Sequence, residues 1–224
     1  MLTELLRAWR KRDLLRRIFD EFIQMLDISR GMFEAVCEVL EGKRKLEEVK
    51  VTIYQHDQEI NKLEQTIRTQ LLEHLTLRPG VDISACLVLM SVVKDAERLG
   101  DYCKNLIEVA EMYRRKLTEG RYVIPLLEIK RNIDRMFAGI ALAFGQSDEI
   151  AAHSINSASG SITQKCDLLL QQLMCDNLPT DKAVAYTLLT RYFKRISAHL
   201  SNIATSVLVP LPRLDYHDER RGSK

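Results

Sequence analysis

Apolar residues recur every three or four positions along almost the whole of this 224-residue chain. That spacing puts them on one face of an α-helix, whereas a strand would show an alternation of period two, which the sequence lacks. Glycines and prolines interrupt the pattern and leave helical stretches at about 2–41, 44–77, 82–119, 121–144, 148–176 and 181–209. The pattern therefore predicts an all-α protein with a body of six long helices.

The interruptions also contain residues that begin helices. Asp82, Ser147 and Thr180 each stand at the start of an apolar stretch, and their side chains are of types preferred at the N-cap. Near residues 10–13 the first stretch is strongly polar, and we expect a break there that leaves a short leading helix.

The order of elements predicts an internal repeat. Residues 71–106, "LLEHLTLRPGVDISACLVLMSVVKDAERLGDYCKNL", can be aligned with residues 169–203, "LLQQLMCDNLPTDKAVAYTLLTRYFKRISAHLSNI". Both contain an apolar helix end, a break at proline and a long helix. We expect two three-helix units, 1–119 and 120–209, packed as one body and followed by a tail at 210–224.

Composition and charge exclude several classes of protein. With 33 basic and 31 acidic residues, the chain lacks the basic excess of a nucleic-acid binder. It contains no apolar run of about 18 residues that would span a bilayer, and its N-terminus lacks the features of a signal peptide. The five cysteines form no CxxC pair, which is typical of free thiols in a reducing compartment. We expect a cytoplasmic protein, at most peripheral to a membrane.

Candidate chemistry lies on the third helical stretch. Glu97 and Asp101 are spaced four apart at the margin of its apolar stripe, and Gly100 lies inside the stripe, where a neighbouring helix could approach closely. Two carboxylates beside a helix crossing suit a hard divalent cation. An acidic edge that is solvated or paired with arginine is the alternative.

Two segments carry a family resemblance. "KDAERLGDYCKNLIEVAE", residues 94–111, resembles the signature helix of PhoU-type phosphate-uptake regulators, approximately K-x-x-E-R-I-G-D-x-x-x-N-I. "HDQEINKLEQTIRTQLLEHL", residues 56–75, resembles the second helix of the same family. The resemblance covers about residues 13–209 and implies two tandem PhoU-like three-helix repeats.

The resemblance also implies a set of metal ligands, because the family carries E(D)xxxD motifs that can hold multinuclear metal centres. The matching positions of the first repeat are Asp57, Asn61, Glu97 and Asp101, with Asn61 replacing the stronger Asp. A divalent or iron-type metal (Mg, Mn, Fe or Zn) is expected there, unless Arg98 or another base neutralises the acids.

The second repeat departs from the motif. Its matching positions are Ser159, Thr163, Lys194 and Ala198, which provide hydroxyls and a positive charge instead of carboxylates. Any metal is therefore expected at the first repeat only. His199 stands next to the last of these positions, where a structural role is the simpler interpretation.

No enzyme is predicted. None of the five histidines has a glutamate three residues before it, as a di-iron bundle would require, and HExxH, P-loop and G-x-S-x-G motifs are absent.

Both ends of the chain offer further candidates. Trp9, Arg10, Lys11 and Arg12 belong to a basic amphipathic segment that could bind an anionic membrane face or a partner groove, or could pack on the protein's own core. Acids and a histidine in the tail could bind metal, although a solvated tail explains them as well.

The function implied by the resemblance is a non-catalytic regulator of phosphate uptake and phosphate signalling. Its implied partners are a phosphate transporter at the inner membrane and a sensor histidine kinase. The alternatives are an accessory subunit of a sodium- or proton-coupled phosphate transporter and a metal-binding helical bundle. The sequence does not fix the oligomeric state, and a homodimer is among the states it allows.

Overall fold

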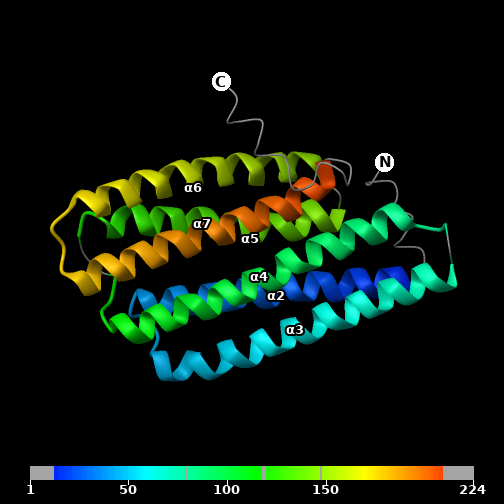
Figure 1. The fold of residues 1–224 in the computed structure, drawn as a ribbon, viewed down its shortest axis with the longest axis horizontal. Coiled ribbons are helices and arrows are strands. Elements are labelled where there is room, and N and C mark those ends of the chain that lie inside the picture. The colour runs from blue at the N-terminus through cyan, green and yellow to red at the C-terminus, as the bar shows by residue number, and fades with distance from the viewer. Residues whose placement is uncertain (1–12, 79, 118–119, 147, 209–224) are drawn as a thin grey trace.

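A computed structural model of the chain describes residues 13–78, 80–117, 120–146 and 148–208 (Figure 1). These residues form long helices and no strand. The helices are α2 (Asp13–Leu40), α3 (Leu46–Leu77), α4 (Ile83–Tyr113), α5 (Val123–Gln146), α6 (Glu149–Cys175) and α7 (Thr180–Leu208). The all-α class and the six long helices are confirmed.

The helices pack as two trios. Helices α2, α3 and α4 contact one another, as do α5, α6 and α7, and the trios meet where α4 packs on α7 and α2 packs on α5. In Figure 1, α3 and α6 form opposite outer edges of the elongated body, with the other helices between them. Whether each trio forms a domain of its own stays a prediction.

Aromatic side chains hold the two trios together. Phe33 of α2 contacts Phe137 of α5 and Phe193 of α7, with ring centroids 5.5 and 5.7 Å apart. Phe144 of α5 lies between Phe19 and Phe22 of α2. Fully burying one such ring stabilises the folded state by about 1.5–3 kcal/mol, so the joint between the trios is part of the hydrophobic core.

The helix ends differ in detail from the expectation. The carboxylate of Asp148, one residue after the predicted Ser147, caps α6 by accepting from the backbone N–H groups of Ile150 and Ala151 at 2.9 and 3.1 Å. Asp82 takes the N-cap position of α4 without a side-chain cap hydrogen bond. Thr180 is the first residue of α7.

Helix α4 stops at Tyr113, six residues before the predicted end at 119. Arg114 adopts a left-handed conformation, with φ of 50°, and turns the chain back toward α2. The backbone N–H of Leu117 then donates to the carbonyl of Leu40 at 2.8 Å, and the Leu117 side chain is buried. This packing replaces the last turn and a half of the expected helix.

Candidate functional site

The predicted ligand residues of the first trio lie where α3 packs on α4. Asp57 and Asn61 are on α3, and Glu97 and Asp101 are on α4. Asp57 and Glu97 are buried, whereas Asn61 and Asp101 are half-buried. The structure therefore brings the motif-bearing faces of the two helices together at one crossing.

Gly100 makes this close crossing possible. It lies within regular α4 and has no positive φ. A Cβ built on it would lie 2.8 Å from Cδ1 of Ile60, so the side chain of Ile60 on α3 occupies the space that a side chain at position 100 would need. Ile60 itself is buried, and the acids flank it at the margin of the packed surface. The predicted role of this glycine at a helix crossing is confirmed.

A lysine bridges two of the acids. The Lys104 ammonium lies 2.8 Å from a carboxylate oxygen of Asp57 and 3.2 Å from one of Asp101. Partial burial disfavours the charged ammonium, but its hydrogen bonds to the two carboxylates outweigh that effect and raise the pKa of Lys104. The bridge joins α3 to α4 with a positive charge supplied by the protein.

The remaining acids of the crossing are also paired with bases. Arg98 donates to Asp101 at 2.8 Å and lies 3.7 Å from Glu97. Lys94 lies 2.7 Å from Glu97 and 3.8 Å from the buried Glu64 of α3. We call the whole ion-paired group the α3–α4 seam: Asp57, Glu64, Lys94, Glu97, Arg98, Asp101 and Lys104.

As arranged, the seam does not fit a metal ion. Within the described part of the chain, no three His, Cys, Asp or Glu side chains are grouped so that they could hold one. The ammonium of Lys104 lies between Asp57 and Asp101, and Arg98 pairs with Asp101 as the alternative interpretation expects. Metal binding at this position stays a prediction.

Sequence reasoning missed three members of the seam. Lys104 is three residues from Asp101, and Lys94 is three residues from Glu97, so each could have been found as a neighbour on the surface of one helix. Glu64 is two turns after Asp57 on the same face of α3. The bridge between helices could not have been found, since it depends on which faces of α3 and α4 meet.

In the second trio the corresponding positions form a different arrangement. Ser159 of α6 and Ser197 of α7 are buried and hydrogen-bonded to each other at 3.0 Å. The Lys194 ammonium turns to Asp167 of α6 at 2.5 Å, so it does not join the serines. Thr163 and Ala198 are half-buried. Ser159 and Ser197, the neighbour of Ala198, therefore join α6 to α7 through a hydroxyl hydrogen bond.

A second polar cluster joins the two trios and was not predicted. The carboxylate of Asp95 on α4 lies 2.7 Å from Nδ1 of His199 and accepts from the side-chain amide of Asn202 at 3.0 Å. The His199 ring stacks on the Tyr102 ring. The Arg195 guanidinium lies over the same Tyr102 ring, and its Nε donates to the Tyr102 hydroxyl at 3.1 Å. The structural role expected for His199 is consistent with these contacts.

The remaining candidates cannot be placed. Trp9, Arg10, Lys11 and Arg12 lie outside the described residues, as does the tail at 210–224. Within the described ranges, none of the helices combines the length and the apolar character that crossing a bilayer requires.

Comparison with known proteins identifies relatives of this chain. Residues 22–110 match the family model of the PhoU domain. Over 206 residues the chain is 24% identical to a Xylella fastidiosa protein named "Phosphate-specific transport system accessory protein PhoU homolog", covering 88% of this chain and 82% of that protein. A second strain of the same species has a similar relative, also 24% identical.

Solved structures agree with the sequence match. The crystal structure of PhoU from Pseudomonas aeruginosa aligns with a TM-score of 0.80 at 19% identity and covers 94% of this chain and 99% of that chain. The phosphate transport system regulatory protein PhoU from Streptococcus pneumoniae aligns with a TM-score of 0.76, also at 19% identity. The resemblance is therefore confirmed: the chain is homologous to PhoU proteins and has their fold.

Proposed function

We propose that this homologue of PhoU proteins is a non-catalytic accessory regulator of a phosphate transport system. The observation that carries the proposal is the extent of the match. A PhoU structure aligns with 94% of this chain, which includes both helical trios, and the sequence match covers 82% of a curated accessory protein. In this proposal the chain binds the cytoplasmic side of an inner-membrane phosphate transporter, a sensor kinase, or both. It restrains uptake or signalling when phosphate is ample.

The α3–α4 seam is the docking surface in this proposal. Its acids are mostly buried, whereas the side chains of Lys94 and Arg98 remain 41% and 46% exposed. The acids hold these bases in place, and the outer sides of the bases can still meet carboxylates of a partner. Complementary charges at an interface speed association and select the partner, which suits a regulator that binds and leaves.

The proposal is tested by capturing the partners from native membranes. The full chain, carrying an affinity tag, is compared with the double variant Lys94→Gln, Arg98→Gln. A matched control, Arg131→Gln with Arg135→Gln, removes two exposed charges from α5 instead. We expect the wild type and the control to capture a subunit of a phosphate transporter and the seam variant to capture less.

Two outcomes would count against the proposal in different ways. If the wild type captures no component of phosphate transport or its signalling, the accessory function itself is wrong. If the seam variant captures the transporter as well as the control does, docking occurs on another face of the molecule.

A further inference from the structure

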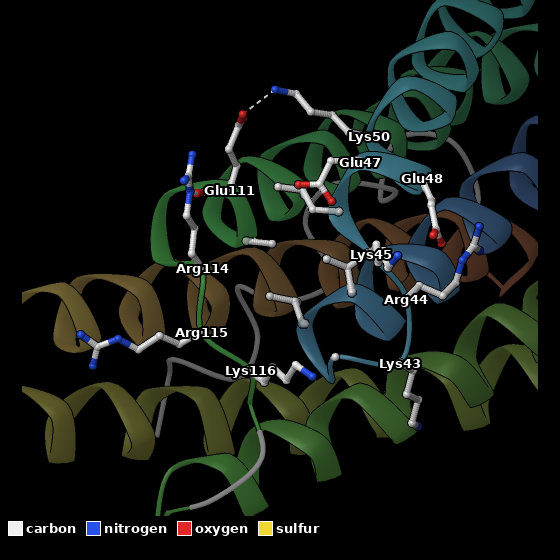
Figure 2. Close-up of a pocket in the computed structure, with 15 residues that line it drawn as sticks. Lys43, Arg44, Lys45, Glu47, Glu48, Lys50, Glu111, Arg114, Arg115 and Lys116 are labelled. Atoms are coloured by element: carbon white, nitrogen blue, oxygen red, sulfur yellow. Dashed lines mark hydrogen bonds and ion pairs between the residues drawn. The ribbon is translucent and has the colours of Figure 1, made fainter.

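A recess lies where the turn between α2 and α3 meets the end of α4, away from the α3–α4 seam (Figure 2). Its volume is about 850 Å³, within the range of about 300–1,000 Å³ that is usual for small-molecule sites. Two runs of basic residues line it: residues 43–45 in the turn and residues 114–116 after α4. Nothing in the proposed function uses this recess.

The recess carries an excess of positive charge. Its lining includes seven bases and only three glutamates: Lys43, Arg44, Lys45, Lys50, Arg114, Arg115 and Lys116, with Glu47, Glu48 and Glu111. Glu111 is already paired with Lys50 at 2.6 Å. Lys43 pairs with Glu41 and Arg44 with Glu38, both outside the lining, and Glu47 and Glu48 further reduce the positive potential of the recess without cancelling it.

Three of the bases are not neutralised by the protein. Arg115 pairs with Asp181 at 3.0 Å, and in Figure 2 it points away from the other lining residues. Lys45, Arg114 and Lys116, by contrast, have no carboxylate partner among the residues that the structure describes. Arg114 donates only to the carbonyl of its own helix, at Glu111. Their charges are therefore available to a ligand.

The backbone fixes the two runs of bases on opposite walls. Gly42 has φ of 73°, and a Cβ there would overlap the stem of Lys116, so the lysine packs directly on the turn. The hydrogen bond from the N–H of Leu117 to the carbonyl of Leu40 ties the segment after α4 to the end of α2. The recess is thus formed before any ligand arrives, which lowers the entropic cost of binding.

The start of α3 adds to the positive potential. The helix begins at Leu46, in the wall of the recess, and its N-cap residue Lys45 makes no side-chain cap hydrogen bond. The first N–H groups of a helix have no partner within the helix, and they carry the positive end of its dipole. Lysine ammonium groups and helix N–H groups together are the donors that proteins use for phosphate oxygens.

We propose that this recess binds a small soluble anion with adjacent phosphate groups, such as an oligophosphate. Free bases on two walls suit an anion that carries charge along its length. A lipid surface fits less well, because the apolar residues of the lining, such as Leu40 and Leu46, are buried or half-buried and do not protrude. This inference goes beyond the proposed function, and its test requires no transporter.

The test is calorimetric titration of the full chain with tripolyphosphate at physiological salt. The double variant Lys45→Gln, Lys116→Gln removes two free charges from the recess, and Arg131→Gln with Arg135→Gln removes two exposed charges elsewhere. We expect the recess variant to bind at least about tenfold more weakly and the control to bind like the wild type, since hydrogen bonds to charged groups are the stronger kind. Thermal unfolding of both variants verifies that they are folded.

Parallel titrations with a tetraglutamate peptide and with vesicles containing anionic lipid separate the other possible ligands. Preference for tripolyphosphate over both supports the proposal. It is overturned by the absence of tripolyphosphate binding, by equal binding of the recess variant and the control, or by stronger binding of the peptide or the vesicles.

Discussion

Gly100 shows how one missing side chain allows two helices to pack closely. A glycine inside a helix costs about 1 kcal/mol relative to alanine, and here that cost allows Ile60 of α3 to fill the space above α4. The acids Asp57, Glu97 and Asp101 are carried to the same crossing as a result. The close packing at Gly100 and the ion pairs of the seam therefore lie at one helix crossing.

The first prediction separates helix propensity from packing at this crossing. The contact that a Cβ would make is with Cδ1 of Ile60, the end of a side chain that can shift, so Gly100→Ala alone should change the free energy of unfolding by less than about 1 kcal/mol. In an Ile60→Val background, which lacks that atom, the same change should stabilise the protein by up to about 1 kcal/mol. Urea unfolding of the four proteins measures both effects.

Gly100→Leu provides the contrast. It should destabilise by about 1–3 kcal/mol, because no rearrangement of Ile60 makes room for a leucine. An unfolding midpoint unchanged by leucine would show that the helices do not cross closely here.

The second prediction concerns the charge of Lys104. Its folded-state pKa is raised, so its contribution to stability is fully present below the pKa of an unfolded lysine, about 10.4, and is lost as pH rises through the higher folded value. Lys104→Gln should destabilise the protein at pH 8. The difference in unfolding free energy from the wild type should shrink as the pH rises above about 10.4. A difference that stays constant with pH would mean that the ion pairs contribute little.

Lys104 also gives the third prediction, on metal binding. The variant Lys104→Gln leaves Asp57 and Asp101 facing each other without the bridging ammonium. Added Mn²⁺ should raise the thermal midpoint of this variant and not that of the wild type, since a ligand stabilises only a folded state that it binds. If the wild type responds as strongly, a metal displaces the lysine, and the ligand set implied by the family is functional in this chain.

At the scale of whole elements, a mutation can test the contact between α4 and α7. Asp95 accepts from both His199 and Asn202, and these side chains are largely shielded from water. The fourth prediction is that Asp95→Ala costs about 1–3 kcal/mol, because it leaves two half-buried donors without an acceptor. Asp167→Ala, which removes an exposed partner of Lys194, is the control and should cost less than about 1 kcal/mol.

Chemical denaturation compares the two variants. Equal losses in the two proteins would show that the Asp95 cluster is no more than a surface contact.

The elements themselves could be predicted from the sequence to within a few residues, with one larger error. Helix periodicity and chain breakers are local signals, so α3, α5, α6 and α7 began and ended close to the predicted positions. The end of α4 was misplaced, because residues 114–117 fold onto the end of α2 and no local pattern reports that contact.

Only part of the candidate site could be predicted, because its acids belong to local motifs whereas its pairings lie between helices. The acids on α3 and α4 were identified by their spacing and by the resemblance, and the structure places them at one crossing. The Lys104 bridge and the Asp95 cluster depend on which helix faces meet. A single sequence does not report those pairings, even though Lys104 stands near the acids along the chain.

At the scale of the whole molecule, the two trios are alike in layout and different in chemistry. The match to the PhoU domain covers residues 22–110, which include most of α2, all of α3 and almost all of α4. In α6 and α7 the motif positions hold no acid, and one of them, Ser159, is hydrogen-bonded to the neighbouring Ser197. The ion-paired acids of the motif are thus found in the first trio, and the matching positions of the second trio carry no carboxylate.

The rate of phosphate uptake shows directly whether the protein restrains a phosphate transporter. Rates are measured under ample phosphate in cells that lack the chain, in cells that regain the wild type, and in cells that regain Lys94→Gln with Arg98→Gln. We predict faster uptake without the chain, restraint restored by the wild type, and weaker restraint by the variant. Uptake that is the same with and without the chain would show that the protein does not restrain phosphate transport.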